Sequence, residues 1–154
     1  MARTLIALLM AVALLVAGCG GSGDDGRAQY VAQLNRAETK LDRSLSVIRR
    51  DVVPGTPIAV IATKVDQGAK ALDQAARDFR AIKPPADARA EQREIVTGVE
   101  QLAAIYRRGA AAARRNDVRA LTRSLQNLQS SPAAQRIRRA QTALRDKGYE
   151  IRAG

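Results

Sequence analysis

Residues 58–82 read IAVIATKVDQGAKALDQAARDFRAI, and the spacing of apolar residues in this stretch decides the fold class. Apolar side chains recur every three or four positions, at Ile58, Ile61, Val65, Ala69, Leu72, Ala76, Phe79 and Ile82. In an α-helix this spacing gathers them on one face, which another helix has to cover. Pro57 suits the first position of a helix, and Lys83-Pro84-Pro85 ends the pattern. The stretch therefore predicts an amphipathic helix with one buried face.

The same spacing recurs in three further segments, at about residues 27–52, 85–115 and 116–147. Asn116 is expected to cap the last of these segments, and Ser131 followed by Pro132 interrupts it with the signature of a new helix start. No stretch alternates apolar and polar residues as a half-buried strand would. Short connections favour antiparallel neighbours. We predict an all-α fold, an up-and-down four-helix bundle over residues 27–152, whose last helix is kinked or broken near Pro132.

Two polar residues and the end of the chain need separate expectations. Glu38 falls close to the stripe of the first segment, where Ala37 is expected to turn inward and leave Glu38 on the rim. Gln92 occupies a stripe position near a helix start and is expected to be a satisfied amide near the surface. Tyr149 and Ile151 are expected to fold back on the end of the bundle. Three leucines are expected in the core, namely Leu72, Leu102 and Leu125.

The composition excludes several kinds of catalytic site. The chain contains no histidine, and its single cysteine is Cys19. Ser-His-Asp and Cys-His catalysis are therefore excluded, and a zinc site would need carboxylates alone, which is rare. Acid–base catalysis would need paired carboxylates inside the bundle, but the candidates fall off the apolar stripes, at Glu38, Glu91, Glu94 and Glu100. We expect a protein that is not an enzyme and that binds no cofactor or metal.

The start of the chain has a pattern of its own. Arg3 precedes an apolar run from Leu5 to Ala17, and the tetrad Val16-Ala17-Gly18-Cys19 overlaps the end of that run. The run is shorter than the about 20 residues of a membrane-spanning helix and is typical of a secretory signal. The tetrad resembles the lipobox of bacterial lipoproteins. That resemblance implies that residues 1–18 are removed and that Cys19 carries a lipid, which anchors the chain on the extracytoplasmic side of the cell membrane. The glycine-rich residues 19–26 are expected to form a flexible tether.

The rest of the chain resembles a group of small actinobacterial helical-bundle lipoproteins. The likeness rests on Lys83-Pro84-Pro85-Ala86-Asp87-Ala88-Arg89, on Ile95-Val96-Thr97-Gly98-Val99 with Leu102-Ala103, and on the ending Lys147-Gly148-Tyr149-Glu150-Ile151-Arg152. Because that group carries no assigned activity, the resemblance implies a lipid-anchored bundle and transfers no functional residue.

Positive charge is concentrated in the last third of the chain. Residues 104–154 hold 12 basic and 3 acidic side chains, a net charge of +9, whereas residues 19–103 hold 13 basic and 12 acidic ones, a net charge of +1. Such an asymmetry favours an anionic partner for the basic part. The candidate contact residues for anionic lipid or an anionic wall polymer are Arg107, Arg108, Arg114, Arg115, Arg119 and Arg123. The alternative is a solvated face in an arginine-rich chain, which has 21 Arg and 5 Lys.

These observations favour one function over its rivals. We expect a membrane-anchored envelope protein that acts as a binding or scaffolding module, with a protein partner that the sequence does not identify. Nucleic acid is not an expected partner, because the chain is expected to be exported and offers few aromatic side chains for stacking on bases. The alternative is a carrier of a small molecule or lipid, with a cavity between the helices.

Overall fold

The computed structural model describes residues 22–152, with side chains from Asp25 onward. Every regular element in this part of the chain is helical, which confirms the all-α prediction. The elements are α1 (Ser22–Arg50), α2 (Ile58–Ala81), the 3₁₀ turn η1 (Ala86–Ala88), α3 (Arg89–Arg114), α4 (Val118–Gln126) and α5 (Pro132–Asp146).

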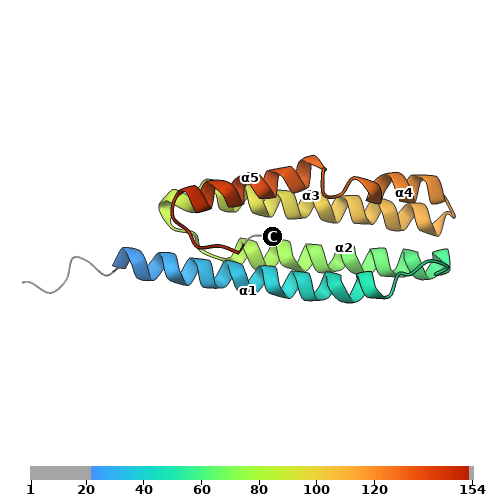
Figure 1. Ribbon diagram of the computed structural model, residues 1–154, viewed down its shortest axis with the longest axis horizontal. Helices are drawn as coiled ribbons and strands as arrows, with labels where there is room; N and C mark the ends of the chain where they lie inside the picture. Colours follow the sequence, from blue (N-terminus) through green and yellow to red (C-terminus); the bar gives the residue numbers. More distant parts are fainter. Residues whose placement is uncertain (1–21, 153–154) are drawn as a thin grey trace, which may run out of the picture.

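The helices pack in chain order, with α3 at the centre (Figure 1). α1 and α2 run antiparallel, α2 packs against α3, and α4 and α5 follow each other along α3. The turn between α1 and α2 and the turn between α3 and α4 lie at one end of the molecule, which we call the turn end. α1 packs on α2 but makes little contact with α5. The side of the molecule between α1 and α5 is therefore incompletely closed.

The break near Pro132 is confirmed, and its cause is local. Ser131 caps α5, since its hydroxyl accepts a hydrogen bond from the backbone nitrogen of Ala134 at 3.2 Å, and Pro132 occupies the first helical position. The cap of α4 is Asp117, whose carboxylate accepts from the Ala120 nitrogen at 2.9 Å, so the expectation for Asn116 was wrong. Asn116 instead has a φ of 55°, a left-handed conformation that turns the chain out of α3.

The tether differs from its expected boundaries, because α1 begins at Ser22 and residues 22–26 belong to the helix. The two glycines in this stretch argued for coil, since glycine weakens a helix by about 1 kcal/mol relative to alanine. Asp25 acts in the opposite direction, because negative charge near a helix N-terminus is favourable. The proposed signal segment, residues 1–18, and the proposed lipidation site, Cys19, lie outside the described residues.

The core is largest near the start of α1 and thins toward the turn end. Five large side chains are almost fully buried, namely Tyr30, Leu34, Leu72, Ile95 and Leu144. Near the turn end the buried cluster is built mainly from alanines with Val65 and Leu121. Leu102 and Leu125, which were expected in the core, are only half-buried. Leu125 lies on α4, which is short and packs mainly on α3.

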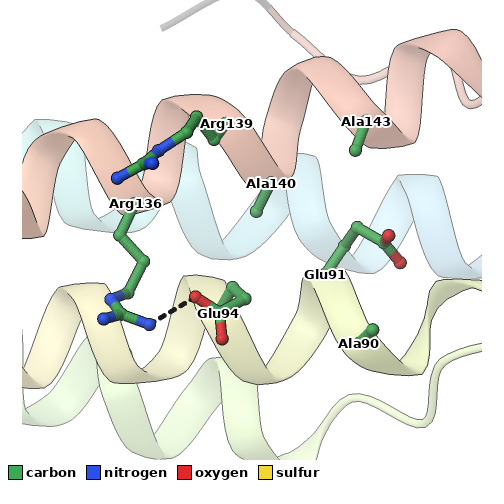
Figure 2. Close-up of a pocket in the computed structure, with 7 residues that line it drawn as sticks. All are labelled: Ala90, Glu91, Glu94, Arg136, Arg139, Ala140 and Ala143. Atoms are coloured by element: carbon green, nitrogen blue, oxygen red, sulfur yellow. Dashed lines mark hydrogen bonds and ion pairs between the residues drawn. The ribbon is translucent and has the colours of Figure 1, made fainter.

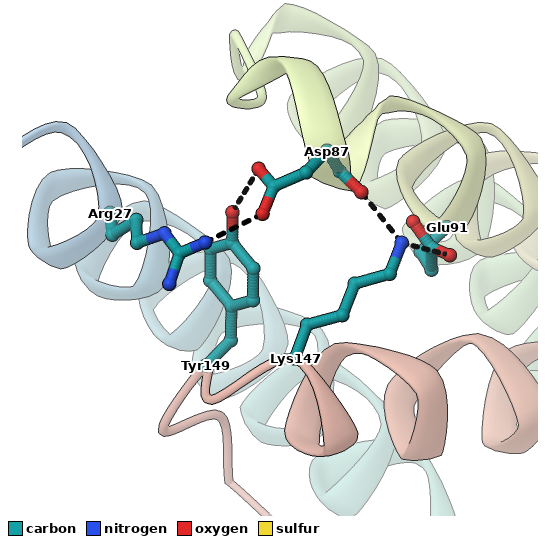
Figure 3. A network of polar contacts seen from close by, with 5 residues as sticks. All are labelled: Arg27, Asp87, Glu91, Lys147 and Tyr149. Carbon is teal, nitrogen blue, oxygen red and sulfur yellow. Dashed lines mark hydrogen bonds and ion pairs between the residues drawn. The ribbon is translucent and has the colours of Figure 1, made fainter. Parts of the chain in front are cut away.

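The end of the chain folds back as expected and closes the opposite end (Figure 3). Tyr149 and Ile151 are buried, and the Tyr149 hydroxyl donates to Asp87 Oδ1 at 2.7 Å. Arg27 pairs with the other oxygen of Asp87 at 2.7 Å, while Lys147 pairs with Glu91 at 2.7 Å. The start of α1, the start of α3 and the end of the chain are thus held together.

Candidate functional site

The six candidate arginines are all exposed and lie on two consecutive helices. Arg107, Arg108 and Arg114 belong to the last two turns of α3, Arg115 follows directly, and Arg119 and Arg123 lie on α4. Because the turn from α3 into α4 lies at the turn end of the molecule, the chain brings these side chains to that region (Figure 1). The six residues therefore lie on the two helices, and the segment between them, that meet at the turn end.

Two of the six arginines are neutralised by α2. Nη1 of Arg107 lies 2.7 Å from both carboxylate oxygens of Asp73, and Arg114 lies 2.8 Å from Asp66. Hydrogen bonds from Arg114 and Lys70 hold the pKa of Asp66 below its usual value. Both pairs are exposed, so each adds at most about 1 kcal/mol to stability. Their side chains connect α3 to α2, which makes Arg107 and Arg114 poor candidates for binding an external anion.

The other four arginines have no carboxylate within ion-pair distance among residues 25–152, and we call this set the basic end: Arg108, Arg115, Arg119 and Arg123. Asp117 lies next to this set in the sequence, but its carboxylate caps α4. Four exposed positive charges on two adjoining segments produce a local positive electrostatic potential. The arrangement can attract an anionic surface but holds no group for covalent chemistry.

Exposed apolar side chains accompany the basic end. The large apolar residues that are most exposed in the described chain all belong to segments near the turn end: Val47, Val52, Val53, Val60 and Val118. Val118 is 58% exposed and is followed directly by Arg119. Val52 and Val118, which continue the apolar spacing of their own segments in the sequence, are therefore not buried. No element packs over them, because α1 ends at Arg50 and α4 begins at Val118.

A small hollow between α3 and α5 brings carboxylates and arginines together (Figure 2). Its volume is about 360 Å³ and its lining residues are Ala90, Glu91, Glu94, Arg136, Arg139, Ala140 and Ala143. Arg136 donates to Glu94 at 2.5 Å, and the hydrogen bond from Lys147 holds the pKa of Glu91 below its usual value. Both carboxylates are therefore paired with a cation, Glu91 with Lys147 and Glu94 with Arg136. Because the pairing with Lys147 favours the ionised form of Glu91, this carboxyl does not supply the protonated acid that general acid catalysis needs.

The polar stripe residues have structural partners that the sequence did not reveal. Gln92 is buried, so the expectation that it lies near the surface was wrong. Its Oε1 accepts a hydrogen bond from the Tyr30 hydroxyl at 2.8 Å, and its Nε2 donates one to the carbonyl of Phe79 at 2.5 Å. Glu38 is half-buried beside the inward-facing Ala37, and its Oε1 accepts from Gln141 Nε2 at 2.9 Å. Positions 38 and 141 are 103 residues apart, so no local sequence signal joins them.

Within residues 22–152, no helix is both long and apolar enough to cross a membrane. No cluster of three or more potential metal ligands occurs in that same part of the chain. Comparison with known proteins finds no matching family, no similar curated protein and no similar solved structure.

Proposed function

We propose that this protein is a non-enzymatic envelope module, anchored to a membrane through Cys19, whose basic end contacts an anionic wall polymer. The observation that supports this proposal is the placement of the four arginines that have no carboxylate partner among residues 25–152, at the end of the bundle away from the start of α1. With an anchor at one end and a cationic surface toward the other, the protein would connect the membrane to the wall polymer.

The distance from the anchor favours a polymer over the anchoring membrane itself. Cys19 and Ser22 are three residues apart, so a lipid on Cys19 stays within about 11 Å of the first residue of α1. α1 has 29 residues and is therefore about 43 Å long. In an upright bundle the basic end stands several Debye lengths above that membrane, since the Debye length is about 8 Å at physiological salt. Its charges would then act on an anion farther out.

The expected affinity of the basic end alone is low. Each basic residue close to an anionic surface contributes about 1 kcal/mol, so four give about 4 kcal/mol, which corresponds to a Kd of about 1 mM. A membrane anchor raises the effective concentration of the basic end near the wall, so weak contacts accumulate along the polymer. The proposal therefore requires both the lipid and the arginines for firm attachment.

The test compares two charge-matched variants of the full lipidated chain in neutral lipid nanodiscs. One replaces the basic end with glutamine at positions 108, 115, 119 and 123. The control replaces four exposed basic residues elsewhere, namely Arg36, Lys83, Arg89 and Arg93. Binding to long-chain polyphosphate, used as an anionic polymer, should fall at least tenfold for the first variant and much less for the control, and it should weaken with added salt.

Equal losses in the two variants would mean diffuse attraction without a site and would contradict the proposal. Stronger binding of the wild type to phosphatidylglycerol vesicles than to the polymer would assign the basic end to lipid headgroups instead. The carrier alternative is favoured by a different observation, the groove described next.

A further inference from the structure

An apolar groove lies along the incompletely closed side of the bundle, between α1 and α5, with a volume of about 600 Å³. Its buried lining residues are Phe79, Ile95 and Val99, and half-buried side chains complete its apolar lining: Leu41, Leu45, Leu102 and Ile137. This volume lies within the range of small-molecule sites, which are mostly apolar with a few placed polar groups. The groove has that composition.

Polar groups gather at one end of this groove. Gln141 is 9% exposed and donates to Glu38 Oε1, while Nη1 of Arg152 donates to Thr39 Oγ1 at 3.0 Å. Glu38 Oε2 and Gln141 Oε1 form no hydrogen bond with other residues in the described chain, although both residues line the groove. Burial raises the pKa of Glu38, which is consistent with its position in the wall of the groove.

The groove is amphipathic along its length. From Glu38 to Leu45 the wall formed by α1 extends for about 10 Å. α3 runs the same way, so Ile95 lies toward the polar end and Leu102 toward the apolar end, and α5 runs the opposite way from Ile137 to Gln141. Glu38 and Gln141 therefore lie at one end of the groove, and Leu45, Leu102 and Ile137 lie toward the other. The exposed residues Asp42 and Arg43 line its rim between Leu41 and Leu45.

The charges at the polar end select a headgroup. Charges of both signs stand at this end, Glu38 against Arg152 and Arg145, so an ionised headgroup of either sign meets a repulsion together with an attraction. A hydroxyl group can donate to the Glu38 carboxylate and accept from the Arg152 guanidinium. We propose that the groove binds a single-chain amphiphile with a neutral hydroxyl headgroup, the chemistry of a monoacylglycerol. This proposal does not depend on the basic end.

The test uses the full lipidated chain in phosphatidylcholine nanodiscs and a photoreactive 1-monodecanoylglycerol with a diazirine in its acyl chain. Labelled peptides identified by mass spectrometry should contain the groove residues Leu41, Leu45 and Leu102. Unlabelled monodecanoylglycerol should displace the probe at least tenfold better than decanoate, decyltrimethylammonium or decane, which keep the chain and change the headgroup. This factor is the size expected for one hydrogen bond to a charged group.

Matched variants on one helix locate the site. Leu45→Trp fills the groove and should reduce labelling about tenfold, whereas Val47→Trp, at a side chain that is 49% exposed, should leave it unchanged. Leu102→Phe provides a second groove-filling variant if Leu45→Trp loses its helical circular dichroism. Glu38→Ala should abolish the preference for the hydroxyl headgroup over decane.

Three outcomes would overturn the proposal. Labelling spread evenly over the helices, or unchanged in both groove-filling variants, would mean that the groove holds no ligand. Better displacement by decanoate or decyltrimethylammonium would refute the assigned headgroup. A wild-type dimer that Leu45→Trp dissociates, without labelling of the groove, would make this surface an interface between two copies of the chain.

Discussion

At the scale of single residues, Asp87 is the point where three parts of the chain meet (Figure 3). The hydrogen bond from Tyr149 holds its pKa below the usual value, and the charge of Arg27 acts in the same direction. Burial and then the same hydrogen bond raise the pKa of Tyr149 to about 12, so the hydroxyl stays protonated and donates. The Arg27 guanidinium also lies 5.0 Å from the centre of the Tyr149 ring. The docked end of the chain therefore depends on an ionised Asp87.

Tyr149→Phe removes this hydrogen bond and keeps the ring. A carboxyl whose pKa is lowered by folding stabilises the native state above its unfolded pKa, about 4, and loses that contribution as the pH falls through the lower, folded pKa. We expect the variant to unfold at lower urea concentration near neutral pH, and we expect its difference from the wild type to shrink as the pH falls below about 4. Urea titrations followed by circular dichroism measure both effects.

Tyr106→Phe is the control, because Tyr106 is half-buried and has no carboxylate partner among the described residues. Its effect on stability should not vary between neutral and acidic pH. A Tyr149→Phe difference that stays constant over the same interval would contradict the role assigned to Asp87.

At the scale of elements, α3 can hold α5 closely because position 98 has no side chain. A Cβ at Gly98 would lie 2.5 Å from Ile137 Cγ1 and 3.0 Å from the carbonyl oxygen of Ala133. The side chain of Ile137 can shift, but the backbone of α5 cannot do so without moving the helix. Gly98 therefore sets the spacing of the α3 and α5 pair, and with it the position of Ile137 beside the groove.

Gly98→Ala should destabilise the fold by about 1–2 kcal/mol. Overpacking costs about 1–3 kcal/mol, and the better helix propensity of alanine returns up to about 1 kcal/mol. Gly109→Ala is the matched control on the same helix, since the nearest atoms to its Cβ lie at 3.4 Å. That change should be neutral or stabilising. Thermal and urea unfolding measure the change in stability of both variants. Equal changes would show that close packing at position 98 does not cause the destabilisation.

At the scale of the whole molecule, the two ends have different chemistry. Near the start of α1 the chain end, η1 and α1 are joined by buried tyrosines and ion pairs. The turn end has the thin alanine core, the exposed valines and the basic end. If a lipid on Cys19 holds the first end at the membrane, the second end is free to meet other material in the envelope.

The anchor predicts a specific pattern of processing and extraction. Mass spectrometry of the protein from its native membrane should show residues 1–18 removed and a diacylglycerol on Cys19, and Cys19→Ser should leave the full precursor without lipid. Two acyl chains give stable attachment, so detergent should extract the native protein whereas high salt should not. Retention of residues 1–18 on an unmodified Cys19 would refute the anchor and, with it, the connector proposal.

The helices themselves could be read from the sequence, because their causes are local. Apolar periodicity, the prolines after α2 and the Ser131-Pro132 start of α5 act within a few residues of the position that they determine. The fold class and the break in the last helix follow from the sequence for this reason. The beginning of α1 was predicted less well, because glycine and aspartate have opposing effects on the same helix end.

What only the tertiary structure decided is which charges are neutralised and where the groove lies. Sequence alone grouped Arg107 with Arg108, but packing places Arg107 against Asp73 on α2 and leaves Arg108 without such a partner in the described chain. Likewise, Glu38 and Gln141 meet across 103 residues. These features depend on the distance between packed helices and on the rotation of each helix about its axis. Both are set by the side-chain volumes on the two sides of an interface, such as the one at Gly98. No single segment of the sequence therefore encodes them.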